Sequence, residues 1–260
     1  MKIAFFDSGI GGLTVLHQAM KILPNEDYLF YADTAHVPYG EKPKEMVKKY
    51  VLEAADFLAA QDIKALVVAC NTATSIAIED LRRIFSFPIL GIEPAVKPAI
   101  QQSEKKRKKV LVLATRLTLK EEKYHHLVEC IDKYDIVDGL PLPGLVTLAE
   151  QYNFHEDQVV PYLKEQLMPF DLNQYGTVVL GCTHFPFFKD SVKKLFPDET
   201  DIIDGSIGTA NNLKRILRER GQIGGGTGAI TFYQSSVEVK DPETLGHYHE
   251  ALGRLDDLNK

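Results

Sequence analysis

Strand-like and helix-like patterns alternate along most of this 260-residue chain. Short β-branched apolar runs, typical of strands buried on both faces, are each followed by a longer stretch typical of a helix. This alternation predicts a largely parallel sheet covered by helices on both faces. Strands are expected at residues 3–6, 28–32, 65–69, 89–91, 110–114, 135–138, 177–180, 201–204 and 229–233, and helices at 13–23, 45–60, 73–85, 120–131, 156–166, 188–195, 207–220 and 242–255.

The pattern runs through two similar rounds, which predicts two domains. We expect both to be doubly wound, mainly parallel α/β units related by pseudo-symmetry, with an active site in the cleft between them. Residues 1–95 together with 208–260 are expected to form the first domain, and residues 96–207 the second. The helix expected at 207–220 would return the chain to the first domain.

Two cysteines occupy matching places in the two halves, in Ala69-Cys70-Asn71-Thr72 and Gly181-Cys182-Thr183-His184. Each follows an apolar run, so each should lie at the carboxyl end of a parallel strand, where ligands of open α/β sheets bind. The helix that follows Cys70 is expected to lower the pKa of its thiol. A lone cysteine after a strand is more often buried filler. Two in matching settings favour a pair of thiols facing one substrate, whereas Cys130 lies in a helical pattern and is interpreted as structural.

Polar residues follow other expected strands. Asp7-Ser8-Gly9-Ile10-Gly11-Gly12 opens a helix, and its amides suit an anionic ligand, although Thr14 occupies the third glycine position of a dinucleotide fingerprint. Asp7 and Ser8 are equally consistent with a simple helix cap. Asn71 and Thr72 supply donors and acceptors for a carboxylate or an amine. The pair Tyr39-Gly40 is read either as a substrate contact or as an ordinary turn.

Glu150 follows an apolar stretch and is compatible with a catalytic or a solvated carboxylate. Metal binding is not expected, because no Cys-x-x-Cys occurs and the histidine spacing does not fit a zinc finger. The glycines at 224–226 lack the Lys-Ser/Thr ending of a phosphate loop and are interpreted as a flexible connection.

Charge and hydropathy exclude other classes of protein. The net charge of −6 argues against nucleic-acid binding, and the basic run at residues 105–109 is interpreted as a solvated loop. No apolar run is long enough for a signal peptide or a membrane helix. Three cysteines, an odd number, do not suggest a disulfide framework. We therefore expect a cytoplasmic protein with reduced thiols.

Taken together, four motifs closely resemble those of the glutamate racemases. They are Phe6-Asp7-Ser8-Gly9-Ile10-Gly11-Gly12, Ala32-Asp33-Thr34 with Pro38-Tyr39-Gly40, Ala69-Cys70-Asn71-Thr72-Ala73, and Gly181-Cys182-Thr183-His184-Phe185-Pro186. The resemblance implies a cofactor-independent racemisation of L-glutamate and D-glutamate that supplies D-glutamate for peptidoglycan, in a homodimer.

The resemblance also implies roles for individual residues. Cys70 would remove the α-proton of D-glutamate and Cys182 that of L-glutamate, with Asp7, His184 and Glu150 as supporting catalytic residues. The implied substrate-binding residues are Asp7, Ser8, Tyr39, Gly40, Asn71, Thr72, Thr115, Thr183 and His184.

Two alternatives stay open at this point. One is an aspartate racemase, or another amino-acid racemase of the same superfamily, which would use the same paired thiols on a side chain of different length. The other is an amino-acid-binding protein without catalysis. The second is less favoured, because binding a carboxylate requires no thiol.

Overall fold

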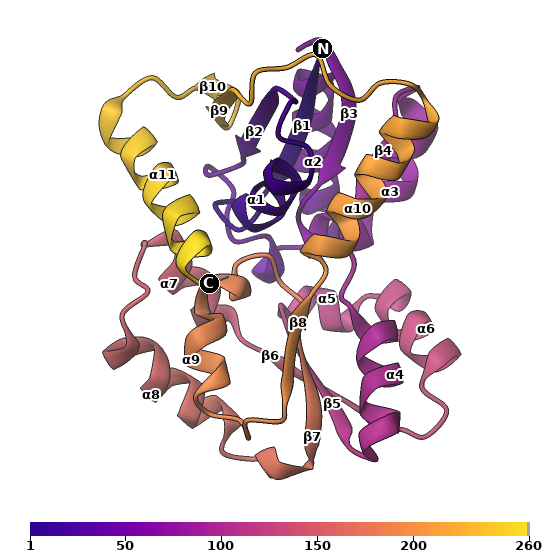
Figure 1. Ribbon diagram of the computed structural model, residues 1–260, viewed down its shortest axis with the longest axis vertical. Coiled ribbons are helices and arrows are strands. Elements are labelled where there is room, and N and C mark those ends of the chain that lie inside the picture. Colours follow the sequence, from indigo (N-terminus) through magenta and orange to yellow (C-terminus); the bar gives the residue numbers. More distant parts are fainter. Residues whose placement is uncertain (259–260) are drawn as a thin grey trace.

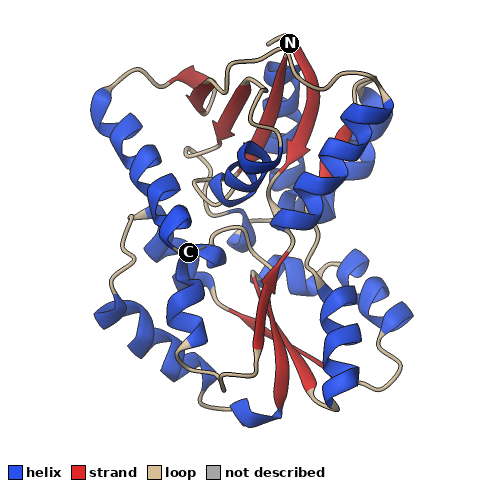
Figure 2. Ribbon diagram, in the orientation of Figure 1, coloured by secondary structure: helices blue, strands red, loops and turns tan. Residues whose placement is uncertain are grey.

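The chain folds into two lobes, each built on its own sheet, as the computed structural model of residues 1–258 shows (Figures 1 and 2). The first lobe contains a six-stranded sheet in the order β10-β9-β2-β1-β3-β4, in which β10 alone is antiparallel. Its strands are β1 (Lys2–Asp7), β2 (Tyr28–Ala32), β3 (Ile63–Val68), β4 (Ile89–Gly91), β9 (Ile230–Gln234) and β10 (Val237–Glu238).

The second lobe contains a fully parallel four-stranded sheet in the order β6-β5-β7-β8. Its strands are β5 (Lys109–Ala114), β6 (Val137–Pro141), β7 (Tyr175–Leu180) and β8 (Asp201–Asp204). The order matches that of β2-β1-β3-β4 in the first lobe, so β3 and β7 hold equivalent places. Cys70 and Cys182 follow these two strands, which explains why their sequence settings are alike.

Helices cover both faces of each sheet, as the alternating pattern predicts. In the first lobe α1, α10 and α11 lie on one face and α2 and α3 on the other; in the second lobe α4 and α6 lie opposite α7, α8 and α9 (Figure 1). The helices are α1 (Leu13–Ile22), α2 (Lys44–Ala59), α3 (Asn71–Ile84), α4 (Val96–Lys106), α5 (Arg116–Lys120), α6 (Glu122–Ile131), α7 (Pro143–Glu150), α8 (Glu156–Leu167), α9 (Lys189–Lys193), α10 (Ser206–Glu219) and α11 (Pro242–Asp257), with short 3₁₀ turns η1 (Tyr39–Glu41), η2 (Leu172–Gln174) and η3 (Phe185–Phe188).

The predicted two-domain, mainly parallel α/β fold is confirmed, while three helices were not predicted. The sequence left residues 96–106, 116–119 and 143–150 unassigned, where α4, most of α5 and α7 form. Pro98 and the following charges obscured α4, yet a proline in the first turn breaks no helical hydrogen bond. Pro143 begins α7 in the same way.

The apolar core has three parts, and one of them joins the lobes. The largest buried cluster includes Leu13 and Phe30 of the first lobe together with Leu145 and Phe185 of the second. The buried members of the other two clusters come from one lobe each, under α2 and α3 in the first and under α4 and α6 in the second. The lobes therefore share a continuous apolar contact on the side of α1, α10 and α11.

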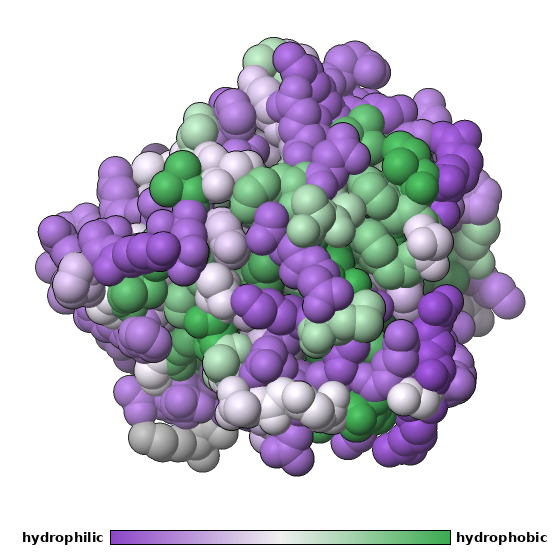
Figure 3. Space-filling view, turned by 90° about the horizontal axis from the view of Figure 1, so that it is seen from above, coloured by the Kyte–Doolittle hydropathy of each residue, from purple (hydrophilic) through white to green (hydrophobic). Residues whose placement is uncertain are grey.

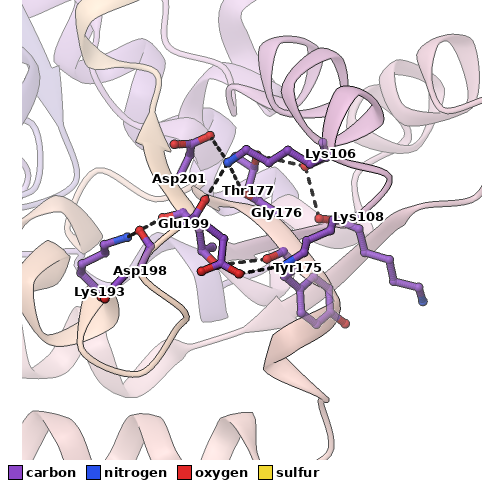
Figure 4. A network of polar contacts seen from close by, with 12 residues as sticks. Lys106, Lys108, Tyr175, Gly176, Thr177, Lys193, Asp198, Glu199 and Asp201 are labelled. Carbon is purple, nitrogen blue, oxygen red and sulfur yellow. Dashed lines mark hydrogen bonds and ion pairs between the residues drawn. The ribbon is translucent and has the colours of Figure 1, made fainter.

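The basic run at residues 105–109 is not the solvated loop expected from sequence. Lys106 ends α4 and Lys109 begins β5. The charges of Lys106 and Lys108 are paired (Figure 4). Lys106 lies 2.8 Å from Asp201, and Lys108 lies 3.1 Å from Glu199. These pairs join the end of α4 and the residue before β5 to the start of β8 and the segment before it. The basic run therefore helps to hold the second sheet together.

The glycine-rich segment at 224–226 has no regular secondary structure, as predicted, but it is anchored. Gly224 N–H donates to Glu26 Oε1 at 2.6 Å, and Gly226 N–H donates to Asn25. Glu26 also forms a buried ion pair with Lys64, 2.5 Å from Nζ to Oε2. This network holds the return from α10 to β9.

On the face seen from above, hydrophilic side chains form much of the surface and apolar side chains gather near its middle (Figure 3). Ile84 and Tyr134 are among the large apolar residues that stay exposed. Over residues 1–258, no helix combines the length and the apolar character needed to cross a membrane.

Candidate active site

The two thiols that follow equivalent strands line a single cavity between the lobes. Cys70 ends the loop after β3, Cys182 lies in the loop after β7, and both are almost fully buried. The wall between them also carries residues of η1, the N-terminus of α3 and the start of α5. The cavity is lined by Ser8, Pro38, Tyr39, Gly40, Glu41, Cys70, Asn71, Thr72, Thr115, Pro143, Val146, Cys182, Thr183 and His184.

Cys70 lies at the N-cap of α3, where sequence reasoning placed it. The Ala73 N–H donates to its Sγ at 3.4 Å, and Ser8 Oγ lies 3.8 Å from the sulfur. The expected lowering of its pKa is nevertheless wrong for this structure. Burial raises the pKa of Cys70 well above its usual value, the Asp7 carboxylate adds to this, and the Ala73 amide only partly opposes them.

Cys182 belongs to a chain of three side chains. Its Sγ lies 3.6 Å from His184 Nδ1, and His184 Nε2 lies 2.5 Å from Glu150 Oε1. Burial lowers the pKa of His184, but the hydrogen bonds to Cys182 and Glu150 outweigh it and hold that pKa well above its ordinary value. A protonated imidazole beside this sulfur can donate a proton to it or hold its negative charge.

Glu150 also fixes the glycine loop, since the Ile10 N–H donates to Oε1 at 2.8 Å. Glu150 ends α7, one turn after Val146, which lines the cavity. The carboxylate lies behind the cavity wall and reaches the thiol through His184. Of the two readings left open by the sequence, the solvated one is therefore wrong.

Asp7 ends β1 and lies behind the wall on the other side. Its Oδ2 accepts from the amides of Gly12 at 2.9 Å and Gly9 at 3.3 Å, while Oδ1 accepts from Thr183 Oγ1 at 3.4 Å. Burial raises the pKa of Asp7, partly offset by His184 and the two amides. The carboxylate thus holds the loop as a cap would, and it also touches the segment that carries Cys182.

Several expected substrate contacts line the cavity directly: Ser8, Tyr39, Gly40, Asn71, Thr72, Thr115, Thr183 and His184. Asn71 Oδ1 is buried and accepts no hydrogen bond from residues 1–258, so it is available to a ligand donor. The Tyr39 hydroxyl is already used, because it donates to Asp33 Oδ2 at 2.5 Å. Asp7 and Glu150 alone among the predicted site residues do not line the cavity.

Sequence reasoning missed Thr118, which is buried and joins two predicted contacts. Its Oγ1 lies 2.9 Å from that of Thr115 and 3.1 Å from that of Thr72. Thr72 and Thr115 come from different lobes, 3.0 Å apart. The only signal was the i, i+3 spacing of Thr115 and Thr118, which becomes visible once α5 is known to be a helix. No cluster of three or more His, Cys, Asp or Glu side chains suited to a metal ion occurs over residues 1–258.

Comparisons with known proteins show the family to which the chain belongs. The family model described as Asp/Glu/hydantoin racemase matches residues 15–211. Glutamate racemase 2 of Bacillus subtilis is 61% identical over 260 residues, covering 100% of this chain and 98% of the relative. The crystal structure of the Francisella tularensis glutamate racemase in complex with D-glutamate superposes with a TM-score of 0.81 at 29% identity, covering 97% of this chain and 93% of that one.

The Escherichia coli glutamate racemase, solved with L-glutamate and the activator UDP-MurNAc-Ala, superposes with a TM-score of 0.77 at 32% identity, covering 84% of this chain and 82% of that one. These relatives are racemases, so the chain is an isomerase with a two-lobed α/β fold. The chain belongs to the Asp/Glu/hydantoin racemase family, and within it to the glutamate racemases.

Proposed function

We propose that this enzyme interconverts L-glutamate and D-glutamate by two-base proton transfer between Cys70 and Cys182, without a cofactor. The observation that carries the proposal is the placement of two buried thiols in one cavity, near enough that charge on Cys182 raises the pKa of Cys70. Inverting a carbon centre requires proton removal on one face and proton delivery on the other. Two opposed thiols meet that requirement.

In the forward direction, one thiolate takes the α-proton and becomes a thiol, while the electron pair of the broken C–H bond stays on the substrate. The opposite thiol then gives its proton to the other face of that carbon and becomes a thiolate. Ser8 and Asp7 would tune Cys70, and His184 with Glu150 would tune Cys182. The raised pKa of Cys70 favours its thiol form in the closed cavity.

The cavity offers complementary groups to an amino acid. Asn71 Oδ1 is an acceptor for the substrate ammonium, and the hydroxyls of Ser8, Thr72 and Thr183 can donate to carboxylates. Gly40 and Thr115 also line the cavity, and the side-chain carboxylate of glutamate would lie against them. An aspartate racemase is the alternative, and the distance from this wall to the thiols is the feature that would separate the two.

We further propose that the enzyme supplies D-glutamate for peptidoglycan in the cytoplasm and works as a homodimer, with no nucleic-acid or membrane partner. The Escherichia coli glutamate racemase was solved with the activator UDP-MurNAc-Ala, a muramic acid derivative, which supports the link to peptidoglycan. The ion pairs of Lys106 and Lys108 support the absence of nucleic acid. We also propose domain limits of 1–95 with 208–260 and 96–207, supported by the packing of α10 against α1. Analytical ultracentrifugation and limited proteolysis test the dimer and the limits.

Circular dichroism of the purified protein with L-glutamate, D-glutamate and both aspartate enantiomers, in D₂O without added pyridoxal phosphate, tests the proposal. We expect both glutamates to lose their optical signal and to gain deuterium at the α-carbon. Loss of signal with aspartate alone would keep the mechanism and change the substrate. No change with any of the four, together with measurable glutamate binding, would favour a binding protein instead.

A further inference from the structure

The cavity between the thiols is too small for an amino acid. It measures about 20 Å³, which is room for about one water molecule. Cys70 is 5% exposed and Cys182 is 6% exposed. Any substrate must therefore enter through a movement that parts the two lobes, and the structure indicates on which side that happens.

On the side of α1, α10 and α11 the lobes are held together. The largest apolar core crosses the interface there, as described above. The C-terminal half of α11 also reaches the second lobe (Figure 1). Arg254 of α11 donates from Nε to the Phe187 carbonyl at 2.8 Å, pairs with Asp190, and lies 5.0 Å from the centre of the Phe154 ring. Opening on this side would expose a large apolar area.

On the opposite side the contact is mainly polar. The buried members of the cores under α2 and under α4 stay within their own lobes, and Leu117 of α5 is a partly buried apolar residue that packs across. The Gly40 backbone lies against the Thr115 side chain, and Arg116 lies 3.7 Å from Glu41. Parting η1 and α2 from α5 would therefore expose little apolar surface.

One ion pair stands out at this polar side. Lys44, the first residue of α2, donates to Glu121 Oε2 at 2.7 Å. Glu121 lies between α5 and α6, and its side chain is 8% exposed, whereas that of Lys44 is 48% exposed. Within residues 1–258, Lys44 is the cation that pairs with this carboxylate. A buried carboxylate that loses its cation is strongly disfavoured, so the pair stabilises the closed form.

We propose that Lys44 and Glu121 form a latch across the mouth of the cleft. Substrate is admitted when η1 and α2 part from α5, with the hinge on the side of α11 and η3. This inference deepens the proposed function, because it assumes that an amino acid must reach the two thiols. Lys44 and Glu121 do not line the cavity, so their role is to set the balance between closed and open forms.

Alkylation of the buried thiols by iodoacetamide measures opening without any turnover. Peptide mass spectrometry follows Cys70 and Cys182 separately, and the exposed Cys130 serves as an internal reference. We expect Lys44→Met to raise the alkylation rates of both buried thiols about three- to tenfold, relative to Cys130. The charge-swapped double variant K44E/E121K should restore rates close to those of the wild type, which shows that folding is intact.

Lys49→Met is the matched control, because Lys49 lies on the same helix and pairs with Glu53 within the first lobe. Equal rates in K44M, K49M and the wild type would overturn the latch, and so would equal acceleration in both variants. Hydrogen exchange gives the direction of opening: K44M should speed exchange in η1 and α5 and not in η3. Faster exchange in η3 instead would place the opening on the wrong side.

The two proposals fail separately. If K44M accelerates alkylation but no glutamate is racemised, the latch stands and the proposed reaction falls. If glutamate is racemised and K44M leaves alkylation unchanged, the reaction stands and the latch falls.

Discussion

Glu150 Oε1 and His184 Nε2 lie 2.5 Å apart, which joins α7 to the loop that follows β7. The same carboxylate oxygen accepts the Ile10 amide from the first lobe. Glu150 therefore links the orientation of His184, and through it Cys182, to the glycine loop of the opposite lobe. One carboxylate oxygen therefore contacts both the first lobe and the imidazole that lies beside the second thiol.

Glu150→Gln tests this link. Without the carboxylate the pKa of His184 should fall, because the negative charge that helps to raise it is removed. The alkaline limb of the pH–rate profile should move to lower pH, and kcat should fall about tenfold to a hundredfold. KM should change little, because Glu150 does not line the cavity.

The profile is measured by circular dichroism between pH 6 and pH 10, a range that spans about the ordinary pKa values of histidine and cysteine. Glu156→Gln is the control, since Glu156 pairs with Lys194 on the exposed surface. An unshifted alkaline limb in E150Q would contradict the proposed influence on His184.

Cys70→Ser and Cys182→Ser should each reduce glutamate racemisation below detection. A serine hydroxyl is a far weaker acid than a thiol and cannot share a proton with the α-carbon at neutral pH. Cys130→Ser should retain nearly full activity, because Cys130 is exposed on α6, away from the cavity. Loss of optical signal is the measurement, and full activity in either of the first two variants would rule out the two-base mechanism.

Gly9→Ala should inactivate the enzyme while leaving it folded. A Cβ at Gly9 would lie 1.9 Å from Glu150 Oε1, so the carboxylate must leave its bonds with His184 and Ile10. We expect kcat to fall by about a hundredfold, the effect of a displacement near 1 Å in a catalytic group.

Gly208→Ala is the matched control on α10, where a Cβ would meet nothing within 4 Å. It should raise the free energy of unfolding by about 0.5–1 kcal/mol through helix propensity. Thermal unfolding and kcat are measured for both variants. A wild-type kcat in G9A would contradict the prediction, because it would show that displacement of Glu150 does not slow the reaction.

His17 should make the protein less stable in mild acid. Burial lowers the pKa of His17, and the hydrogen bond to Asp256 only partly opposes it. Below about pH 6.5 His17 therefore binds a proton in the unfolded chain but stays neutral in the folded chain. The stability contributed by neutral His17 is present above that pH and is lost as pH falls toward the folded pKa.

Urea unfolding of wild type and His17→Gln at pH 7.5, 6.5 and 5.5 measures this effect, since the range spans about the ordinary histidine pKa. The wild type should lose more stability than H17Q on acidification, because all other titrating groups are shared. Parallel losses in the two proteins would mean that His17 does not titrate differently on folding.

Much of the fold followed from local pattern. The nine predicted strands all form, because β-branched runs such as 65–69 and 177–180 suit strands buried on both faces. Helices with an uninterrupted apolar stripe formed within a few residues of their predicted limits. Helices α4 and α7 were not predicted, because a proline near the N-terminus of each made the segment resemble a loop. Packing against the rest of the protein stabilises both helices.

Local sequence predicted two thiols after equivalent strands, with polar residues beside each, and a family resemblance over nearly the full chain. Tertiary structure decided the rest. Whether Glu150 meets His184, whether Thr118 joins Thr72 and Thr115, and which way the pKa of Cys70 moves all depend on groups far apart in the chain. Burial and long-range contacts set these properties, and no local pattern of residues encodes the depth at which a side chain is buried.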